Sequence, residues 1–167
     1  GCTNTNFACA HGLYGLDKNH YSTAHDMYLI AKACYDKGDL FMNVVTSLDH
    51  TMPASNKHAS AYTIRNTNAM MRQDSDVYRS YVRGIKTGST PEAGYNLIST
   101  ATKDGQTYML VVMGTPYEKD ADGYGLAFSV SAQIYDWAFS SLAVRPALDT
   151  TQDITEVKVK YCSQQDT

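Results

Sequence analysis

Several sequence patterns that would assign a function at once are missing from this chain of 167 residues. Its four cysteines form no Cys-x-x-Cys pair, which argues against a zinc knuckle or a thiol redox motif. The absence of His-Glu-x-x-His and of Gly-Lys-Ser or Gly-Lys-Thr argues against a zinc peptidase and a nucleotide-binding P-loop. We therefore expect no metal and no cofactor.

The sequence also has no run of about 18 apolar residues, so no segment is expected to span a membrane. Lysine and arginine do not cluster and the net charge is −3, so we expect no nucleic-acid partner. What is present is a globular composition, with 43% hydrophobic and 19% charged residues, in a length typical of one domain. No signal peptide is visible and the chain starts at Gly1, so we expect that an upstream segment was removed or left out.

The cysteines leave two alternatives open. Cys2 and Cys9 lie close together in the sequence and could form a disulfide in an exported protein. The other alternative is free thiols, and Cys34 fits a buried free thiol because it falls on the apolar face of a predicted helix.

Hydrophobic periodicity predicts three helices, over residues 22–38, 40–47 and 127–142. Ser22 and Thr23 can cap the first one, and Asp26, three residues after Thr23, resembles a capping box. The third carries a broad apolar stripe and is expected to pack against a sheet.

Two β-prone runs, 95–102 and 106–114, surround an Asp-Gly turn and predict a hairpin. A strand over 84–88 precedes it, and 62–65 is a short strand. Residues 1–21, 48–61 and 72–82 are expected to be polar loops. The run 154–161 alternates apolar and charged residues, so we expect a half-buried strand there.

The predicted strand at 84–88 contains a Lys-Thr-Gly triplet. Lys86 supplies a positive charge, and Thr87 can donate a hydrogen bond to a carboxylate. Gly88 has no Cβ, so a ligand backbone can approach closely, and the backbone N–H of Ser89 can face an oxyanion. Taken alone, the same residues would also fit a solvated edge strand with no function.

The surrounding sequence carries further matches in a fixed order. These are Thr3-Asn4-Thr5-Asn6-Phe7, His11-Gly12-Leu13, Tyr21-Ser22-Thr23-Ala24, Asn66-x-Asn68, Gly84-Ile85-Lys86-Thr87-Gly88 and Ala93-Gly94-Tyr95-Asn96-Leu97. Together they resemble the serine-type D-alanyl-D-alanine carboxypeptidases, the low-molecular-mass penicillin-binding proteins. The resemblance runs from residue 1 to about residue 140.

The resemblance implies an α/β (α+β) fold of the β-lactamase/transpeptidase type, an antiparallel sheet with helices on both faces. Residues 1–146 would be the C-terminal part of this domain, incomplete at its N-terminus. Residues 147–167 would be a linker and the first strand of a β-rich second domain. The location implied is extracytoplasmic, on the cell-wall side of a bacterium.

The resemblance also implies a chemistry. A serine attacks the D-Ala-D-Ala bond of a peptidoglycan stem peptide, water releases the acyl-enzyme, and β-lactam antibiotics acylate the same serine. Lys86 would supply the electrostatics of the site and Thr87 would bind the terminal carboxylate. Gly88 would admit the substrate, and the N–H of Ser89 would form half of the oxyanion hole.

Three departures from the family pattern matter. The chain contains no Ser-x-x-Lys and no Ser-x-Asn, so we expect it to be inactive alone and to need a companion N-terminal fragment or self-association. Some members place an arginine near the start of the last helix, where this chain has Ala127 and Phe128. Ser89 is followed by glutamate at position 92 instead of lysine, so a backbone role is favoured over a nucleophile.

Other assignments stay open. A non-catalytic cell-wall-binding or assembly module on the same fold is the alternative to an enzyme. A β-lactamase fits less well, because it would be similar only around the triplet. His11 is interpreted as a structural loop residue.

Overall fold

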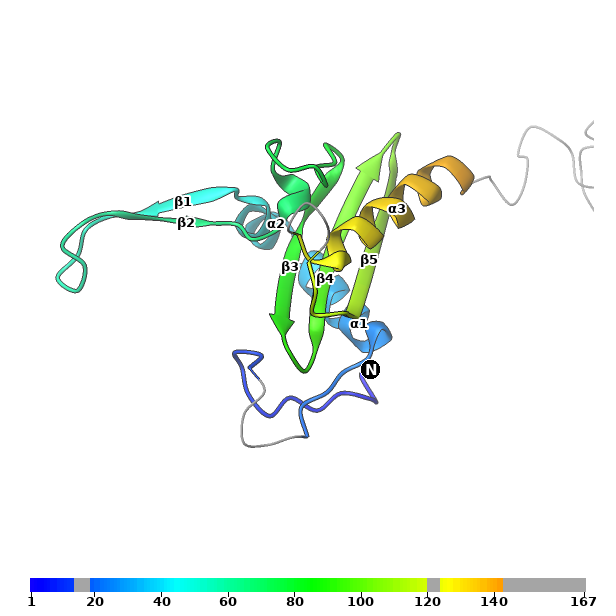
Figure 1. Ribbon diagram of the computed structural model, residues 1–167, viewed down its shortest axis with the longest axis horizontal. Coiled ribbons are helices and arrows are strands. Elements are labelled where there is room, and N and C mark those ends of the chain that lie inside the picture. Colours follow the sequence, from blue (N-terminus) through cyan, green and yellow to red (C-terminus); the bar gives the residue numbers. More distant parts are fainter. Residues whose placement is uncertain (14–18, 120–123, 143–167) are drawn as a thin grey trace, which may run out of the picture.

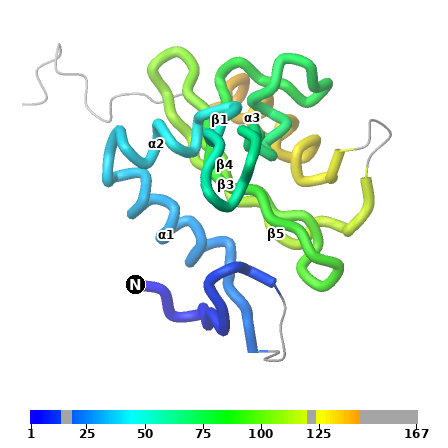
Figure 2. Tube along the Cα trace, turned by 90° about the vertical axis from the view of Figure 1, so that its left-hand side faces the viewer, coloured from blue at the N-terminus to red at the C-terminus, as the bar shows by residue number. Residues whose placement is uncertain are grey.

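The computed structural model describes residues 1–13, 19–119 and 124–142. Its centre is an antiparallel three-stranded sheet in the order β3-β4-β5, formed by Val82–Thr90, Gly94–Lys103 and Gln106–Thr115. Helix α3 (Leu126–Ser141) covers one face, and α1 (Ala24–Tyr35) and α2 (Asp39–Thr46) lie on the other (Figures 1 and 2). This arrangement confirms the expected fold class. The expected strand at 154–161 and the second domain lie outside the described residues.

The predicted hairpin is present, as β4 and β5. Lys103 pairs with Gln106 across a two-residue turn in which Asp104 has φ 51° and Gly105 has φ 76°. Positive φ at both central residues is the geometry that Asp-Gly favours, and it matches the twist of the flanking strands. The turn fixes the register between β4 and β5, and β3 pairs along the other edge of β4.

The hydrophobic core lies between the sheet and α3. Leu97 and Ala101 of β4 are buried against Tyr135 of α3, which is only 1% exposed. The Tyr135 hydroxyl lies 2.9 Å from the Ser99 hydroxyl, and burial raises the pKa of Tyr135. The sheet and α3 are therefore joined by apolar packing and by one buried polar pair.

The N-cap prediction for α1 is confirmed, since the Thr23 hydroxyl accepts the Asp26 N–H at 3.1 Å. The Asp26 side chain does not complete the capping box. Its Oδ2 accepts hydrogen bonds from the Asn4 N–H at 2.8 Å and the Thr5 hydroxyl at 2.7 Å, and the Thr5 bond is the main reason that the Asp26 pKa is lowered. Asp26 thus fastens the N-terminal segment to α1.

The structure resolves the question of the thiols. Cys2 and Cys9 are both free, and their sulfurs contact the backbone oxygens of Asp26 and Leu13. Cys34 is free as well, but it is only half-buried.

Residues 48–61 were expected to be irregular, and this prediction is wrong for part of the segment. Strand β1 (Asp49–Met52) pairs with β2 (Tyr62–Arg65), and the two form an arm that projects from the body (Figure 1). Nearly every residue of the arm is exposed, so it lacks the alternation of buried and exposed positions that marks a strand in sequence. Strand β3 also starts at Val82, two residues before the expected start.

Arg79 and Tyr81, in the segment before β3, are fastened to α3. Arg79 Nη2 lies 2.9 Å from Asp136 Oδ2, and the Tyr81 hydroxyl donates to the same carboxylate. The hydrogen bond from Arg79 lowers the Asp136 pKa, and burial, followed by Asp136, raises the Tyr81 pKa to about 12.

This cluster predicts a pH dependence of stability. A lowered Asp136 pKa means that its contribution is present at neutral pH and is lost as the pH falls through the folded pKa. A raised Tyr81 pKa means that its contribution is lost as the pH rises from 10 to about 12. Because Asp136 is half-exposed, we expect its contribution to be below about 1 kcal/mol.

Urea unfolding midpoints measured between pH 2 and 12 would report both losses of stability, which form the acid limb and the alkaline limb of the curve. Asp136→Asn should make the acid limb less steep, and Tyr81→Phe should do the same for the alkaline limb, to which Tyr135 also contributes. An acid limb identical in wild type and Asp136→Asn would assign the acid loss to other carboxylates, such as Asp26.

Candidate functional site

Strand β3 carries the Lys-Thr-Gly triplet on the outer strand of the sheet. Thr87 pairs with Leu97 of β4, and Gly88 pairs with Asn96. Lys86 and Gly88 are exposed, and Thr87 is half-buried. The triplet thus lies on a surface that a ligand can reach.

The start of the triplet strand is shaped by Gly84. The register between β3 and β4 shifts between Arg83 and Lys86, and Gly84 has φ 50°. A Cβ on Gly84 would lie 2.9 Å from Val45 Cγ2, so a larger residue would collide with α2. The Gly84 carbonyl accepts a 2.6 Å hydrogen bond from the buried Asn68 amide. These contacts fix the position at which Lys86 and Thr87 reach the surface of the protein.

A pocket of about 200 Å³ lies beside the triplet. It brings together residues from four segments, namely Thr67, Thr87, Gly88, Ser89, Tyr95, Asn96, Ala127 and Phe128. Three of the four predicted site residues line it. The fourth, Lys86, is not among the lining residues, and its Nζ donates to the Thr87 carbonyl.

Thr67 and Asn96 belong to the pocket but were not predicted as site residues. The Thr67 hydroxyl hydrogen-bonds the Thr87 hydroxyl. Asn96 Nδ2 donates to the Gly94 carbonyl at 3.1 Å, and its Oδ1 accepts the Gly114 N–H at 2.9 Å. Asn96 therefore holds the ends of β4 and β5 together. The only sequence signals were their positions inside the Asn66-x-Asn68 and Tyr95-Asn96-Leu97 blocks.

Part of the pocket lining is apolar. Ala127 and Phe128, from the first turn of α3, contribute to it together with Tyr95. Tyr95 stacks on Tyr117 with ring centroids 5.1 Å apart, and a Cβ on Gly125 would lie 2.6 Å from the Tyr95 ring. The chain that enters α3 is thus packed closely against Tyr95.

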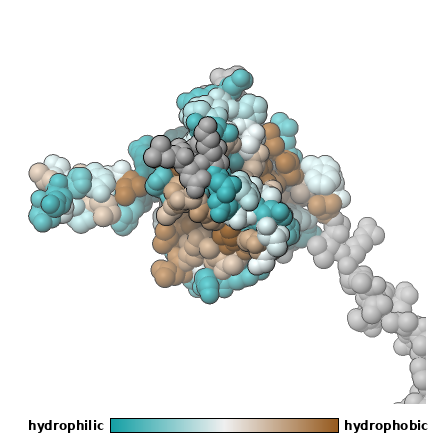
Figure 3. All heavy atoms as spheres, turned by 90° about the horizontal axis from the view of Figure 1, so that it is seen from below, coloured by the Kyte–Doolittle hydropathy of each residue, from teal (hydrophilic) through white to brown (hydrophobic). Residues whose placement is uncertain are grey.

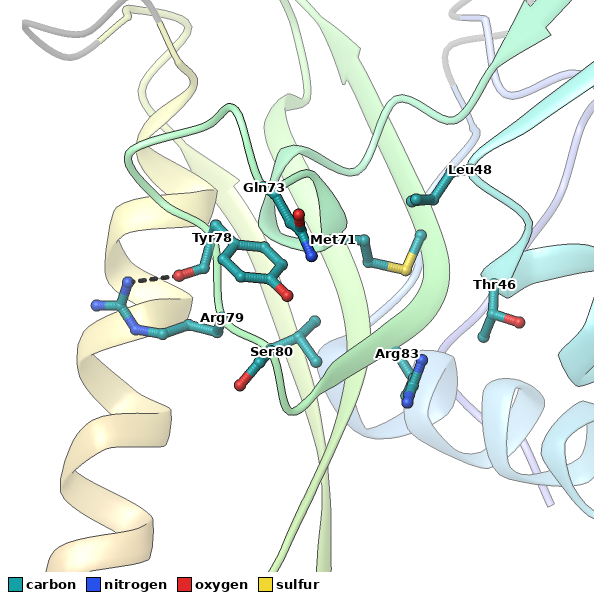
Figure 4. A pocket seen from close by; sticks show the side chains of 9 residues that line it. Thr46, Leu48, Met71, Gln73, Tyr78, Arg79, Ser80 and Arg83 are labelled. Atoms are coloured by element: carbon teal, nitrogen blue, oxygen red, sulfur yellow. Dashed lines mark hydrogen bonds between the residues drawn. The ribbon is translucent and has the colours of Figure 1, made fainter.

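A second hollow, of about 250 Å³, lies around Met71, between the end of α2 and the start of β3. Figure 4 shows Gln73 and Tyr78 beside Met71, and a hydrogen bond from Arg79 to the Tyr78 carbonyl. It is the larger of the two, but it contains no residue of the triplet. We therefore place the candidate site in the smaller pocket.

The N-terminal histidines make local contacts. His11 Nδ1 accepts the Leu13 N–H at 3.0 Å, and His20 Nδ1 accepts the Ala8 N–H at 3.0 Å. These contacts fit the structural interpretation of His11. Within the described part of the chain, no three His, Cys, Asp or Glu residues come together as a metal site, and no helix is long and apolar enough to cross a membrane.

Solved structures show the class of protein that this fold defines. The DD-transpeptidase of Streptomyces K15 is similar over 74% of this chain and 44% of its own, with a TM-score of 0.57 and 27% identity. The D-alanyl-D-alanine carboxypeptidase of Mycobacterium tuberculosis H37Rv shares the fold over 87% of this chain, with a TM-score of 0.65 and 23% identity. The fold is thus that of the DD-peptidases.

The sequence comparison defines the family. The model of the D-alanyl-D-alanine carboxypeptidase family, peptidase S11, matches residues 1–117, and the chain belongs to this family. It is 30% identical to D-alanyl-D-alanine carboxypeptidase DacF of Bacillus subtilis over 98% of its length, and 30% identical to DacA of Haemophilus influenzae over 96%. It spans 38% and 36% of the length of these two relatives.

Proposed function

We propose that this chain forms the Lys-Thr-Gly wall of a serine D-alanyl-D-alanine carboxypeptidase. The enzyme would remove the terminal D-Ala from peptidoglycan stem peptides through an acyl-enzyme, and β-lactams would acylate the same serine. The supporting observation is that Thr87, Gly88 and Ser89 line one pocket with an apolar wall in a chain of this family. The site of action would be extracytoplasmic, on the cell-wall side of a bacterium.

Each residue of the wall has a defined task in this proposal. The Thr87 hydroxyl donates to the terminal carboxylate, and the methyl groups of the D-Ala residues face Phe128 and Tyr95. The Ser89 N–H faces the oxyanion that forms when the scissile carbonyl is attacked. Lys86, whose Nζ lies on the Thr87 carbonyl in the free chain, turns toward the site and supplies positive charge.

The attacking serine would come from outside this sequence, because none of its serines is part of Ser-x-x-Lys or Ser-x-Asn. Two surfaces of this chain are suited to bind a companion polypeptide or a second copy of the chain. β5 is the last strand of the described sheet and has no charged side chain along its ten residues. On α3, Val130, Ile134 and Trp137 are exposed, Trp137 by 57%. Apolar patches also appear on the surface seen from below (Figure 3).

The test is the intact mass of every polypeptide in protein purified from the source organism, denatured before and after incubation with benzylpenicillin. We expect one antibiotic to be added to a polypeptide that carries Ser-x-x-Lys, either joined to this sequence or associated with it. Addition to a serine within these 167 residues would contradict the motif assignment.

A non-catalytic cell-wall-binding or assembly module on the same fold is the second candidate. The same measurement separates the two functions. If no polypeptide gains mass while the sample still binds peptidoglycan, the binding module is supported and the enzyme is not.

A further inference from the structure

Thr67 is held rigidly beside Thr87 by the asparagines on either side of it. Asn66 Nδ2 donates to the carbonyls of Val45 at 3.1 Å and Ser47 at 2.9 Å. Asn68 is 2% exposed and donates to the carbonyl of Gly84. The backbone on both sides of Thr67 is thus fastened to α2 and to β3, and Thr67 is fixed where its hydroxyl meets that of Thr87.

The pocket that Thr67 and Thr87 line has an unusual composition for a site that binds an anion. None of the described residues that line it is charged. Phe128 and Ala127, from the first turn of α3, line it as well. Apart from the charge that Lys86 supplies from outside this lining, a carboxylate in the pocket depends on neutral donors, and the hydroxyls of Thr67 and Thr87 are adjacent ones.

We propose that Thr67 determines the specificity of this pocket for the substrate's terminal carboxylate by orienting the Thr87 hydroxyl. This inference rests on the proposed function. A hydroxyl has one proton to donate. If Thr87 donates to Thr67, it has none left for a carboxylate. When Thr67 donates to Thr87, the Thr87 proton points into the pocket, and each hydroxyl polarises the next.

The test compares Thr67→Val, which keeps the shape but removes the hydroxyl, with Thr67→Ser, which keeps the hydroxyl. Each variant of the 167-residue chain is titrated with N-acetyl-D-alanyl-D-alanine and, separately, with its C-terminal amide. Amide and methyl NMR signals report binding. Thermal unfolding of each variant reports whether the fold is retained.

We expect the wild-type chain to bind the acid more tightly than the amide. Thr67→Val should weaken binding of the acid about three- to tenfold, the value of one hydrogen bond between neutral groups, and leave binding of the amide unchanged. Thr67→Ser should stay within about twofold of wild type for both probes, because the hydroxyl is retained.

Three outcomes would overturn the inference. They are an unchanged affinity for the acid in Thr67→Val, an equal loss for acid and amide, and a wild-type chain that does not prefer the acid. The equal loss would mean that Thr67 only shapes the pocket. None of them depends on acylation by benzylpenicillin, so failure of this inference and failure of the proposed function give different experimental results.

Discussion

Replacing Tyr135 by alanine is expected to lower the free energy of unfolding by about 3–5 kcal/mol, as for other large aromatic residues removed from a core. Tyr135 is 1% exposed and packs between the sheet and α3, where its ring lies near Tyr81 and Phe139. Since small domains are stable by about 5–15 kcal/mol, this loss would remove between about a fifth and all of the stability of the chain. Urea titration followed by circular dichroism measures it.

Tyr135→Phe is the matched control, because it keeps the ring and removes only the hydroxyl. Ser99 is 0% exposed, so its hydroxyl would lose a buried partner, at a cost of about 1–3 kcal/mol. Adding Ser99→Ala should recover part of that loss. If Tyr135→Phe destabilised the chain as much as Tyr135→Ala, the polar pair would matter more than the packing of the ring.

Local sequence signals predicted the elements that depend on local physics. The α1 cap follows from the Thr23 hydroxyl and the Asp26 N–H, and the β4–β5 turn follows from Asp104-Gly105. The triplet was likewise placed correctly on a strand before the hairpin. In each case the residues that determine the structure lie within four positions of one another.

The contacts that were missed are long-range. Asp26 was interpreted as part of a cap, yet it binds Asn4 and Thr5, more than 20 residues away. Thr67 and Thr87 are 20 residues apart in the sequence, and their hydroxyls meet only because β3 lies beside the segment that contains Thr67. The β1–β2 arm buries almost nothing, so no hydrophobic pattern marks it. The family resemblance identified the triplet, but near the second hydroxyl it matched only Asn66 and Asn68, on either side of Thr67.

Lys86→Ala is expected to lower the acylation rate with benzylpenicillin by about 10²- to 10³-fold, the effect typical of removing one group that stabilises the transition-state charge. The expectation applies to the complete enzyme of the proposed function. Lys86 is exposed, and the only hydrogen bond of its side chain among the described residues is to the carbonyl of its neighbour Thr87, so little structure depends on the side chain. Lys57→Ala, in the loop of the exposed arm, removes an equal charge and should acylate like wild type.

Two further observations would separate a catalytic role of Lys86 from a structural one. Its loss should leave the free energy of unfolding of the chain, measured by urea titration, within about 0.5 kcal/mol of wild type, as for other exposed side chains. Lys86→Arg keeps the charge but replaces a compact ammonium by a planar fork, so it should restore the acylation rate only in part. If Lys86→Ala acylated at the wild-type rate, the triplet would be an ordinary solvated strand, and the charge that the reaction requires would have to come from outside this chain.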